Sequence, residues 1–240
     1  MSKKIKHILV VSQYFYPEQF RINDICREWV KRGYKITVLT GIPNYPKGEY
    51  FDGYDKEHRL RETIDGIDII RLPIRPRYKG GKNLFLNYIS FVIEGKKWLR
   101  KNDLKADAVF CYEVSPMTQA LVSVAYSKRY KIPHYIYVTD LWPENVEIVA
   151  GIHNPVILSL IQKMSDYIYK NSKKILTSSK SFIKAIEKRK IDRKNIEFWP
   201  QYAEDFYRPV EESDKNEIPS DGIFNIVFAG NIGFAQGLSI

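Results

Sequence analysis

Two carboxylates and a tryptophan directly follow a short apolar run in the segment HYIYVTDLWPENV, residues 134–146. The run at 135–138 is β-branched and aromatic and predicts a buried strand; Asp140, Trp142 and Glu144 come next. Ligands of open α/β sheets sit just outside the carboxyl ends of the strands, so these side chains are candidates for polar and stacking contacts to a substrate. The alternative is structural: Asp140 would cap the next turn and Trp142 would fill a gap under a loop.

The elements that must position this segment begin with a βαβ unit. The pattern predicts a strand at 7–12, a helix at 22–32 and a strand at 35–40, with Gly33 placed where a helix C-terminal cap is expected. Such a unit predicts a right-handed crossover and a parallel sheet. An aromatic loop at 13–20, QYFYPEQF, joins the first strand to the helix.

The rest of the chain continues the alternation of strands and helices. Asp65-Gly66 between two β-rich runs predicts an antiparallel hairpin, which we interpret as an insertion. The predicted fold class is therefore α/β, a doubly wound and mostly parallel sheet with a β-hairpin insertion. The remaining predicted strands lie at 108–111, 135–138, 174–177 and 195–199, and the remaining helices at 83–99, 118–130, 155–169 and 181–190.

Composition divides the chain near residue 204. We expect one domain at 1–204, a polar and acidic linker at 205–222, and the start of a second domain at 223–240. That last part contains a predicted buried strand at 224–229 and a glycine-rich turn. One strand cannot bury a core, so we expect the second domain to be incomplete.

Charge and composition limit the possible partners. The net charge of +10 favours anionic partners such as nucleotide phosphates or acidic lipid, but no nucleic-acid-binding module is recognisable. Cys26 and Cys111 suggest buried small hydrophobes in a reducing cytosol. The four histidines show no metal-ligand spacing, and no apolar stretch is long enough to span a membrane.

Three segments carry a resemblance to a known family: VVSQYFYPEQFRINDICREWVKRGYKITVLTGIPNYP, VTDLWPENV and VFAGNIGFAQGLSI. In order and spacing they resemble the family-4 retaining glycosyltransferases of bacterial surface-polysaccharide synthesis, such as the capsule, O-antigen and colanic-acid transferases with a DLWPE signature. The resemblance implies a GT-B fold of two Rossmann-like domains facing a cleft. It also implies an acceptor-binding N-terminal domain, a donor-binding C-terminal domain, transfer with retention, and no cofactor or bound metal.

The resemblance assigns roles on the acceptor side. Asp140 becomes the first catalytic candidate, for a polar contact to the transferred sugar or the acceptor hydroxyl, and Glu144 the second. A general base is not required, since the leaving phosphate is thought to take the acceptor proton in this family. The first loop lacks the glycines of many members, which suggests aromatic packing against the acceptor. The acceptor-binding candidates are Tyr14, Tyr16, Glu18, Trp142 and Glu113.

On the donor side the resemblance points to the glycine-rich turn. Its glycines let backbone N–H groups approach a diphosphate, although Asn231 and Gln236 stand where the family usually has cations. An ordinary strand-to-helix turn is the alternative. The donor-binding candidates are Gly230, Asn231, Gly233, Gln236 and Gly237. Because this donor half is incomplete, we expect the chain alone to be inactive.

The implied reaction transfers a sugar from a nucleotide-diphosphate sugar to a lipid-linked or polysaccharide acceptor. A sugar-nucleotide epimerase of the same fold, and a non-catalytic acceptor- or membrane-binding module, remain alternatives. The segment 75–101 combines basic flanks with an apolar helix face, which is compatible either with packing on the sheet or with an anionic membrane surface. We expect a cytoplasmic protein, peripheral on the inner face of the cell membrane.

Overall fold

The computed structural model describes residues 5–203, 207–208 and 222–230. The chain divides into two compact units, Met1–Trp199 and Pro200–Ile240. All helices and strands of the described residues belong to the first unit. None of the helices of these described residues is both long and apolar enough to cross a bilayer.

The first unit is built on one eight-stranded sheet in the order β3-β4-β2-β1-β5-β6-β7-β8. All neighbouring pairs are parallel except β3 with β4, which form the antiparallel hairpin. The strands are β1 His7–Val11, β2 Lys35–Gly41, β3 Arg61–Ile64, β4 Ile67–Leu72, β5 Ala108–Glu113, β6 His134–Val138, β7 Lys174–Thr177 and β8 Ile196–Phe198.

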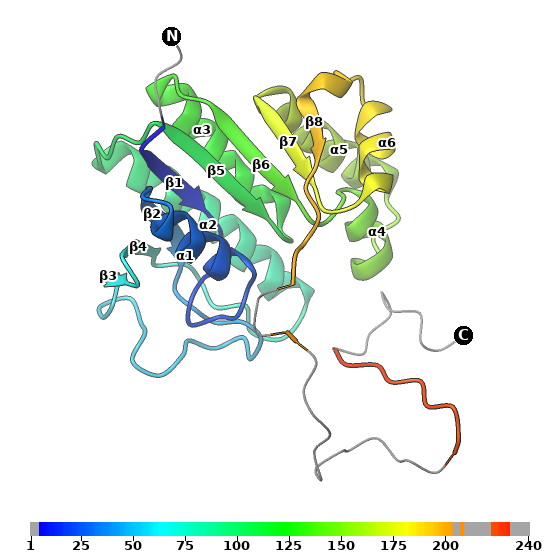
Figure 1. The fold of residues 1–240 in the computed structure, drawn as a ribbon, viewed down its shortest axis with the longest axis horizontal. Coiled ribbons are helices and arrows are strands. Elements are labelled where there is room, and N and C mark those ends of the chain that lie inside the picture. The colour runs from blue at the N-terminus through cyan, green and yellow to red at the C-terminus, as the bar shows by residue number, and fades with distance from the viewer. Residues whose placement is uncertain (1–4, 204–206, 209–221, 231–240) are drawn as a thin grey trace. The chain divides into compact units, whose positions relative to one another are not determined.

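Helices cover the two faces of the sheet unequally. Behind the sheet in Figure 1 lie α2 (Gly81–Lys101), α3 (Ala120–Tyr130) and α5 (Pro155–Lys170). Together with α6 (Lys180–Glu187) they bury two apolar clusters against β1, β2 and β5–β8. The opposite face carries α1 (Ile22–Lys31), whose Ile22, Ile25 and Cys26 pack on β1, β2 and β4.

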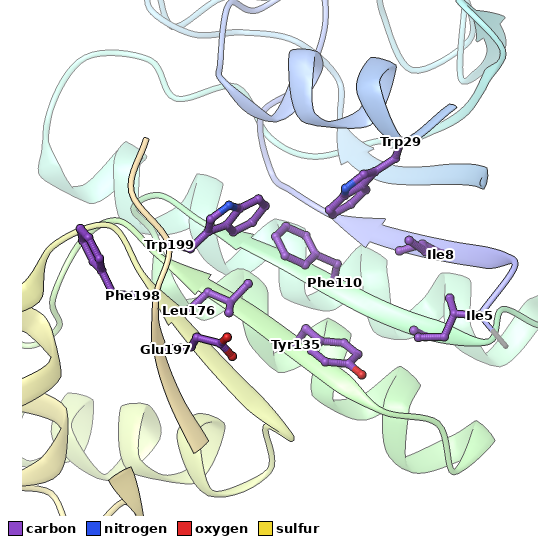
Figure 2. A pocket seen from close by; sticks show the side chains of 10 residues that line it. Ile5, Ile8, Trp29, Phe110, Tyr135, Leu176, Glu197, Phe198 and Trp199 are labelled. Carbon is purple, nitrogen blue, oxygen red and sulfur yellow. The ribbon is translucent and has the colours of Figure 1, made fainter. Parts of the chain in front are cut away.

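The face opposite α3 and α5 therefore retains an apolar groove. Its volume is about 370 Å³, and it lies between α1 and the end of β8 (Figure 2). Aromatic rings form one side: Trp29 and Trp199 each pack against Phe110 at ring-centroid distances of 5.0 and 6.1 Å. The remaining lining residues are Ile5, Ile8, Ala108, Tyr135, Leu176, Glu197 and Phe198.

Local sequence signals explain the turns. Gly33 has φ +84°, and its N–H donates to the carbonyl of Val30, which ends α1 as predicted. Asp65 and Gly66 both have positive φ, +52° and +77°, which matches the predicted hairpin turn. The hairpin is not an appendage, however, because β4 pairs in parallel with β2 and so extends the main sheet.

Two predictions of elements differ from the structure. Helix α4 (Glu144–Ala150) was not expected, and it begins inside the segment where polar residues suggested a loop. The strand predicted at 224–229 is wrong for the described residues: 222–230 contain no strand, and Phe224 and Ile226 are 89% and 90% exposed. A lone apolar run with no paired neighbour lacks the hydrogen bonds that define a strand. The predicted linker at 205–222 lies almost wholly outside the described residues.

Candidate functional site

The carboxyl edge of the sheet brings together polar residues from three strands. The chain order reverses between the neighbouring strands β1 and β5, so their ends form the topological switch point at which ligands of such sheets bind. Gln13 follows β1, Glu113 ends β5, and Asp140 follows β6. The ends of these three strands thus lie next to one another at one edge of the sheet.

Asp140 is held by the loop that follows β5. Its Oδ2 accepts a hydrogen bond of 2.8 Å from the backbone N–H of Ser115, and the side chain remains partly exposed. The capping alternative is wrong, because α4 begins after Pro143 and no side chain caps it. Asp140 is therefore a carboxylate fixed on one oxygen at the mouth of the switch point.

Ser115 also binds Trp142. The indole Nε1 donates to Ser115 Oγ at 3.0 Å, and the ring is 7% exposed within the cluster that contains Val138 and Ile168. The packing alternative therefore describes Trp142, which fills the core beneath the loop. Its predicted contact with an acceptor stays a prediction, with little indole surface left for it.

Glu113 is a buried carboxyl without a hydrogen-bond partner. The residue is fully buried, and neither carboxyl oxygen has a partner among the described residues. Burial, followed by the nearby Asp140, raises the pKa of Glu113 well above its usual value. Its backbone carbonyl accepts from the N–H and Oγ1 of Thr139, at 3.0 and 2.8 Å. The burial of Glu113 beside the loop of Asp140 thus favours the protonated form of its carboxyl group.

Glu144 is engaged by an arginine. It is the first residue of α4, and both of its carboxylate oxygens accept from Arg189 Nη2, at 2.9 and 2.8 Å. The Arg189 side chain is 6% exposed and lies over the ring of Tyr169 at 5.7 Å. This ion pair holds α4 against the end of α6. The catalytic role predicted for Glu144 would require the carboxylate to act while bound in this pair.

Glu18 joins two loops instead of facing solvent. The residue is 2% exposed, and one carboxylate oxygen accepts from the N–H groups of Asn44 and Tyr45, at 2.8 and 2.7 Å. The other oxygen accepts from the N–H of Phe15 at 3.2 Å. Burial raises the pKa of Glu18 to about 7, against the lowering effect of these hydrogen bonds. The arrangement leaves no free oxygen for the predicted acceptor contact.

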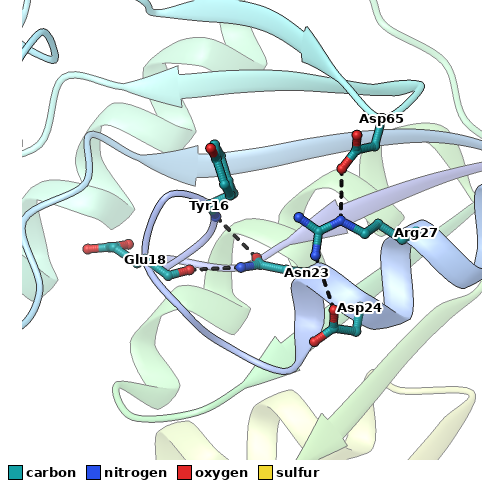
Figure 3. Close-up of polar contacts among 6 residues, drawn as sticks. All are labelled: Tyr16, Glu18, Asn23, Asp24, Arg27 and Asp65. Carbon is teal, nitrogen blue, oxygen red and sulfur yellow. Dashed lines mark hydrogen bonds and ion pairs between the residues drawn. The ribbon is translucent and has the colours of Figure 1, made fainter. Parts of the chain in front are cut away.

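The two predicted tyrosines lie differently. Tyr14 is 2% exposed, stacks on Phe20 at 5.1 Å, and receives a hydrogen bond from Arg77 at 3.4 Å. Tyr16 is 37% exposed and is the accessible ring of this loop. Its backbone N–H donates to Asn23, whose side-chain amide donates to the carbonyl of Glu18 (Figure 3). The loop is thus a rigid aromatic wall that exposes Tyr16.

A buried amide network beneath the edge was missed in the sequence. The N–H of Gln13 donates to Gln119 Oε1 at 2.7 Å, and Gln13 Nε2 donates to Asn87 Oδ1 at 2.7 Å. The side-chain amide of Gln119 donates to the carbonyl of Val114, and that of Asn87 donates to the carbonyl of Arg75. This network ties β1 to the helices behind the sheet and to the β5 loop. Only polar residues inside otherwise apolar helices signalled it.

His134 lies at the opposite end of β6 from Asp140. Its ring nitrogens are bonded to the hydroxyls of Ser123 and Ser172, at 2.8 and 2.9 Å, and burial lowers its pKa to about 3. It is therefore a neutral core histidine.

Two further predictions concern the donor-binding residues and the absence of a bound metal. Of the donor-binding candidates, Gly230 is described and exposed, while Asn231, Gly233, Gln236 and Gly237 lie outside the described residues. Among the described residues, no group of three His, Cys, Asp or Glu side chains could hold a metal ion. The absence of a metal from the reaction stays a prediction.

The family model described as Glycosyltransferase Family 4 matches residues 20–201. Among proteins with curated annotation, none matches the chain.

Solved structures resemble the fold at low sequence identity. An α,α-trehalose-phosphate synthase (UDP-forming) from Burkholderia vietnamiensis is 8% identical, with 83% of this chain and 49% of that chain covered and a TM-score of 0.53. Anabaena Alr3699/HepE, solved with UDP and glucose, is 10% identical, with coverages of 82% and 44% and a TM-score of 0.47. A UDP-N-acetylglucosamine 2-epimerase from Rickettsia bellii is 15% identical, with coverages of 81% and 44% and a TM-score of 0.46. The chain thus spans about half the length of each of these proteins.

Proposed function

Because the chain belongs to glycosyltransferase family 4, we propose that it forms the acceptor-side half of a nucleotide-sugar-dependent glycosyltransferase. The acceptor is a lipid-linked or polysaccharide glycan of bacterial surface-polysaccharide synthesis, and transfer retains the anomeric configuration. The sugar nucleotide binds to a second domain that begins near residue 223. No metal takes part.

The single observation that carries this proposal is the position of Asp140. The carboxylate lies at the switch point of the sheet, partly exposed and fixed by Ser115 N–H on one oxygen. Its second oxygen is suited to accept a hydrogen bond from a sugar hydroxyl and so to orient the attacking or transferred sugar. Orientation of this kind can supply a large part of a catalytic barrier reduction.

The neighbouring groups give Asp140 a defined environment. The raised pKa of buried Glu113 disfavours a second negative charge near Asp140, and the exposed ring of Tyr16 on the loop after β1 is available for stacking on a sugar. Stabilisation of the departing diphosphate, by oriented N–H groups of the donor side, is the main catalytic contribution that we propose.

Replacement of Asp140 tests the proposal. In the full-length protein, supplied with labelled sugar nucleotides and a lipid-linked acceptor, Asp140→Asn should lower transfer at least about tenfold, or about 1.4 kcal/mol of barrier. Asp103→Asn, at the opposite edge after α2, is the matched control and should transfer normally. Equal rates for Asp140→Asn and the parent protein would remove Asp140 from the site.

The same assay separates the alternatives. Incubation with the sugar nucleotide alone would yield an epimerised nucleotide if the protein were an epimerase, and no new sugar linkage. A protein that binds the acceptor but never consumes any of the sugar nucleotides tested would be the non-catalytic module.

A further inference from the structure

The first two turns of α5 are apolar but lie at the surface. Val156, Ile157 and Leu160 are 66%, 43% and 61% exposed, whereas the buried residues of the helix all lie within 165–169. A helix that is apolar on most sides is usually buried in protein or in lipid. The beginning of α5 therefore has the composition of an element that contacts an apolar partner.

This exposed end is a well-formed helix start. Asn154 Oδ1 accepts from the N–H groups of Val156 and Ile157 at 3.0 and 3.2 Å, and Pro155 occupies the first turn. Both features stabilise a helix N-terminus. In the preceding helix α4, Ile148 is 67% exposed as well. The apolar side chains are thus presented on ordered backbone.

The outward face of α5 changes character along its length. Val156, Leu160, Lys163, Tyr167 and Lys170 are all exposed and follow one another at helical spacing, and we name them the α5 stripe. Aliphatic side chains at the start of this face suit the acyl boundary of a bilayer, and tyrosine and lysine farther along it are side chains that reach the level of the headgroups. The tyrosine hydroxyl also accepts from Lys128 at 3.1 Å, which adds another cation to this face.

Charge decides between the possible occupants. Residues 144–194 contain eleven Lys and Arg against five Asp and Glu, in a chain whose net charge is +10. A second copy of the chain would bring like charges together, whereas an anionic lipid surface is complementary to them. The apolar side chains at the same place require an occupant that also offers a hydrocarbon layer.

The helix predicted from sequence as the membrane candidate fits less well. In α2, Phe91 and Leu99 of the apolar face are buried against the sheet and α3, and Val92 is buried as well. Phe85 and Ile93 remain exposed, at 62% and 48%, but they lie on a helix whose apolar face is already covered. Helix α2 thus mainly serves the core.

We propose that the α5 stripe docks on an anionic lipid bilayer. Val156, Ile157 and Leu160 enter the boundary between headgroups and acyl chains, and the lysines face the headgroup phosphates. Helix α5 starts at the carboxyl edge of the sheet, as α4 does, so the bilayer would lie beside the loop of Asp140. The inference rests on the proposed function only for its purpose, the delivery of a lipid-linked acceptor, because docking itself needs neither donor nor turnover.

Vesicle co-sedimentation of the chain tests the proposal. With vesicles of equal parts phosphatidylglycerol and phosphatidylcholine, the parent chain should pellet, and pure phosphatidylcholine or high salt should release it. The double variant Val156→Glu/Leu160→Glu should bind at least about tenfold more weakly, since it removes two apolar anchors and adds two negative charges. Both positions are exposed, so circular dichroism should show an unchanged fold.

A matched variant on α2 provides the control. Phe85→Glu/Ile93→Glu adds the same charge at two apolar positions that are also exposed and should retain binding to vesicles. Equal binding by the α5 variant and the parent chain, or loss of binding only in the α2 variant, would overturn the proposal. Failure of the parent chain to pellet with the vesicles would also overturn it. The same holds if sedimentation analysis shows the parent chain to be a dimer and Val156→Glu/Leu160→Glu to be a monomer. If the full-length protein bound the vesicles but transferred no sugar, only the proposed function would be refuted.

Discussion

At the scale of single residues, the candidate site is organised by carboxyl groups in different environments. Asp140 is partly exposed and fixed by one N–H group, Glu113 is buried without a partner, and Glu18 accepts from three N–H groups. The same side-chain chemistry therefore gives the substrate contact proposed for Asp140, a carboxyl group in Glu113 whose raised pKa favours its protonated form, and a link between loops in Glu18. Environment, not residue type, separates these roles.

Glu113 predicts a specific pH dependence of stability. Its folded-state pKa is raised, so its contribution to stability is fully present below the unfolded value of about 4.5 and declines as the pH rises toward the folded pKa. Glu113→Gln stays neutral and does not undergo this loss. The free energy of unfolding of Glu113→Gln, relative to that of the parent chain, should rise by about 1.4 kcal/mol per pH unit between the unfolded and the folded pKa of Glu113. Urea unfolding between pH 5 and about pH 8 measures the difference.

The control for this experiment is a surface glutamate. Glu197→Gln on β8 removes a carboxylate that is 59% exposed and pairs with Lys174 at 3.4 Å. It should show no comparable rise with pH. A difference between Glu113→Gln and the parent chain that stays constant over the range would show that Glu113 ionises as it does in the unfolded chain.

At the scale of elements, α2 and α3 pack unusually closely through a glycine. A Cβ added at Gly95 would lie 2.7 and 2.8 Å from the two methyl groups of Val122. Valine is stiff at χ1 and cannot easily move aside. The absence of a side chain at residue 95 thus sets the distance between α2, which carries Asn87, and α3, which begins directly after Gln119.

Gly95→Ala should therefore destabilise the chain in spite of the better helix propensity of alanine. Overpacking of a core contact costs about 1–3 kcal/mol, and the gain in propensity is about 1 kcal/mol, so we expect a net loss of up to about 2 kcal/mol in urea unfolding. Val122→Ala makes room for the new methyl group. Gly95→Ala should consequently cost less in the Val122→Ala background than in the parent chain, and strictly additive losses would contradict the steric account.

The sequence predicts most elements but not their side-chain partners. All eight strands of the sheet coincide with predicted runs, because apolar period and turn residues are local signals. Helix α4 was missed because polar residues and Pro143 suggest a loop. The Gln13–Gln119 contact joins residues 106 positions apart, and no local pattern encodes such a distance. Residue type and position in the sequence indicate that Glu18 and Trp142 are site residues. Only the packing of the folded chain shows that both are largely buried.

At the scale of the whole molecule, helices cover the two faces of the sheet unequally. Helices α2, α3, α5 and α6 pack on one face, whereas the face with α1 retains the apolar groove of Figure 2. Uncovered apolar surface of this kind usually binds a partner or another part of the same protein. This groove and the carboxyl edge are separate features, since its lining residues do not include any predicted site residue.

The groove should bind anilinonaphthalene sulfonate, a dye with apolar rings and an anionic sulfonate, in the native state. Tyr135 lines the groove, and Tyr135→Glu places a negative charge in it that repels the sulfonate, which should lower the dye fluorescence severalfold. Phe85→Glu, at an exposed position of α2, is the matched control and should leave the fluorescence unchanged. Equal losses in both variants would mean that the dye binds elsewhere.

Ser115 has a consequence for how this protein is dissected by mutagenesis. Its main chain serves Asp140 and its hydroxyl serves Trp142, so any replacement short of proline erases only the second of these two attachments. A conventional alanine scan would therefore record Ser115 as a minor support of an indole ring. The hydrogen bond from the Ser115 N–H to Asp140 would not be detected by that method. Detecting it requires replacement of the amide between Val114 and Ser115 by an ester, which removes the N–H.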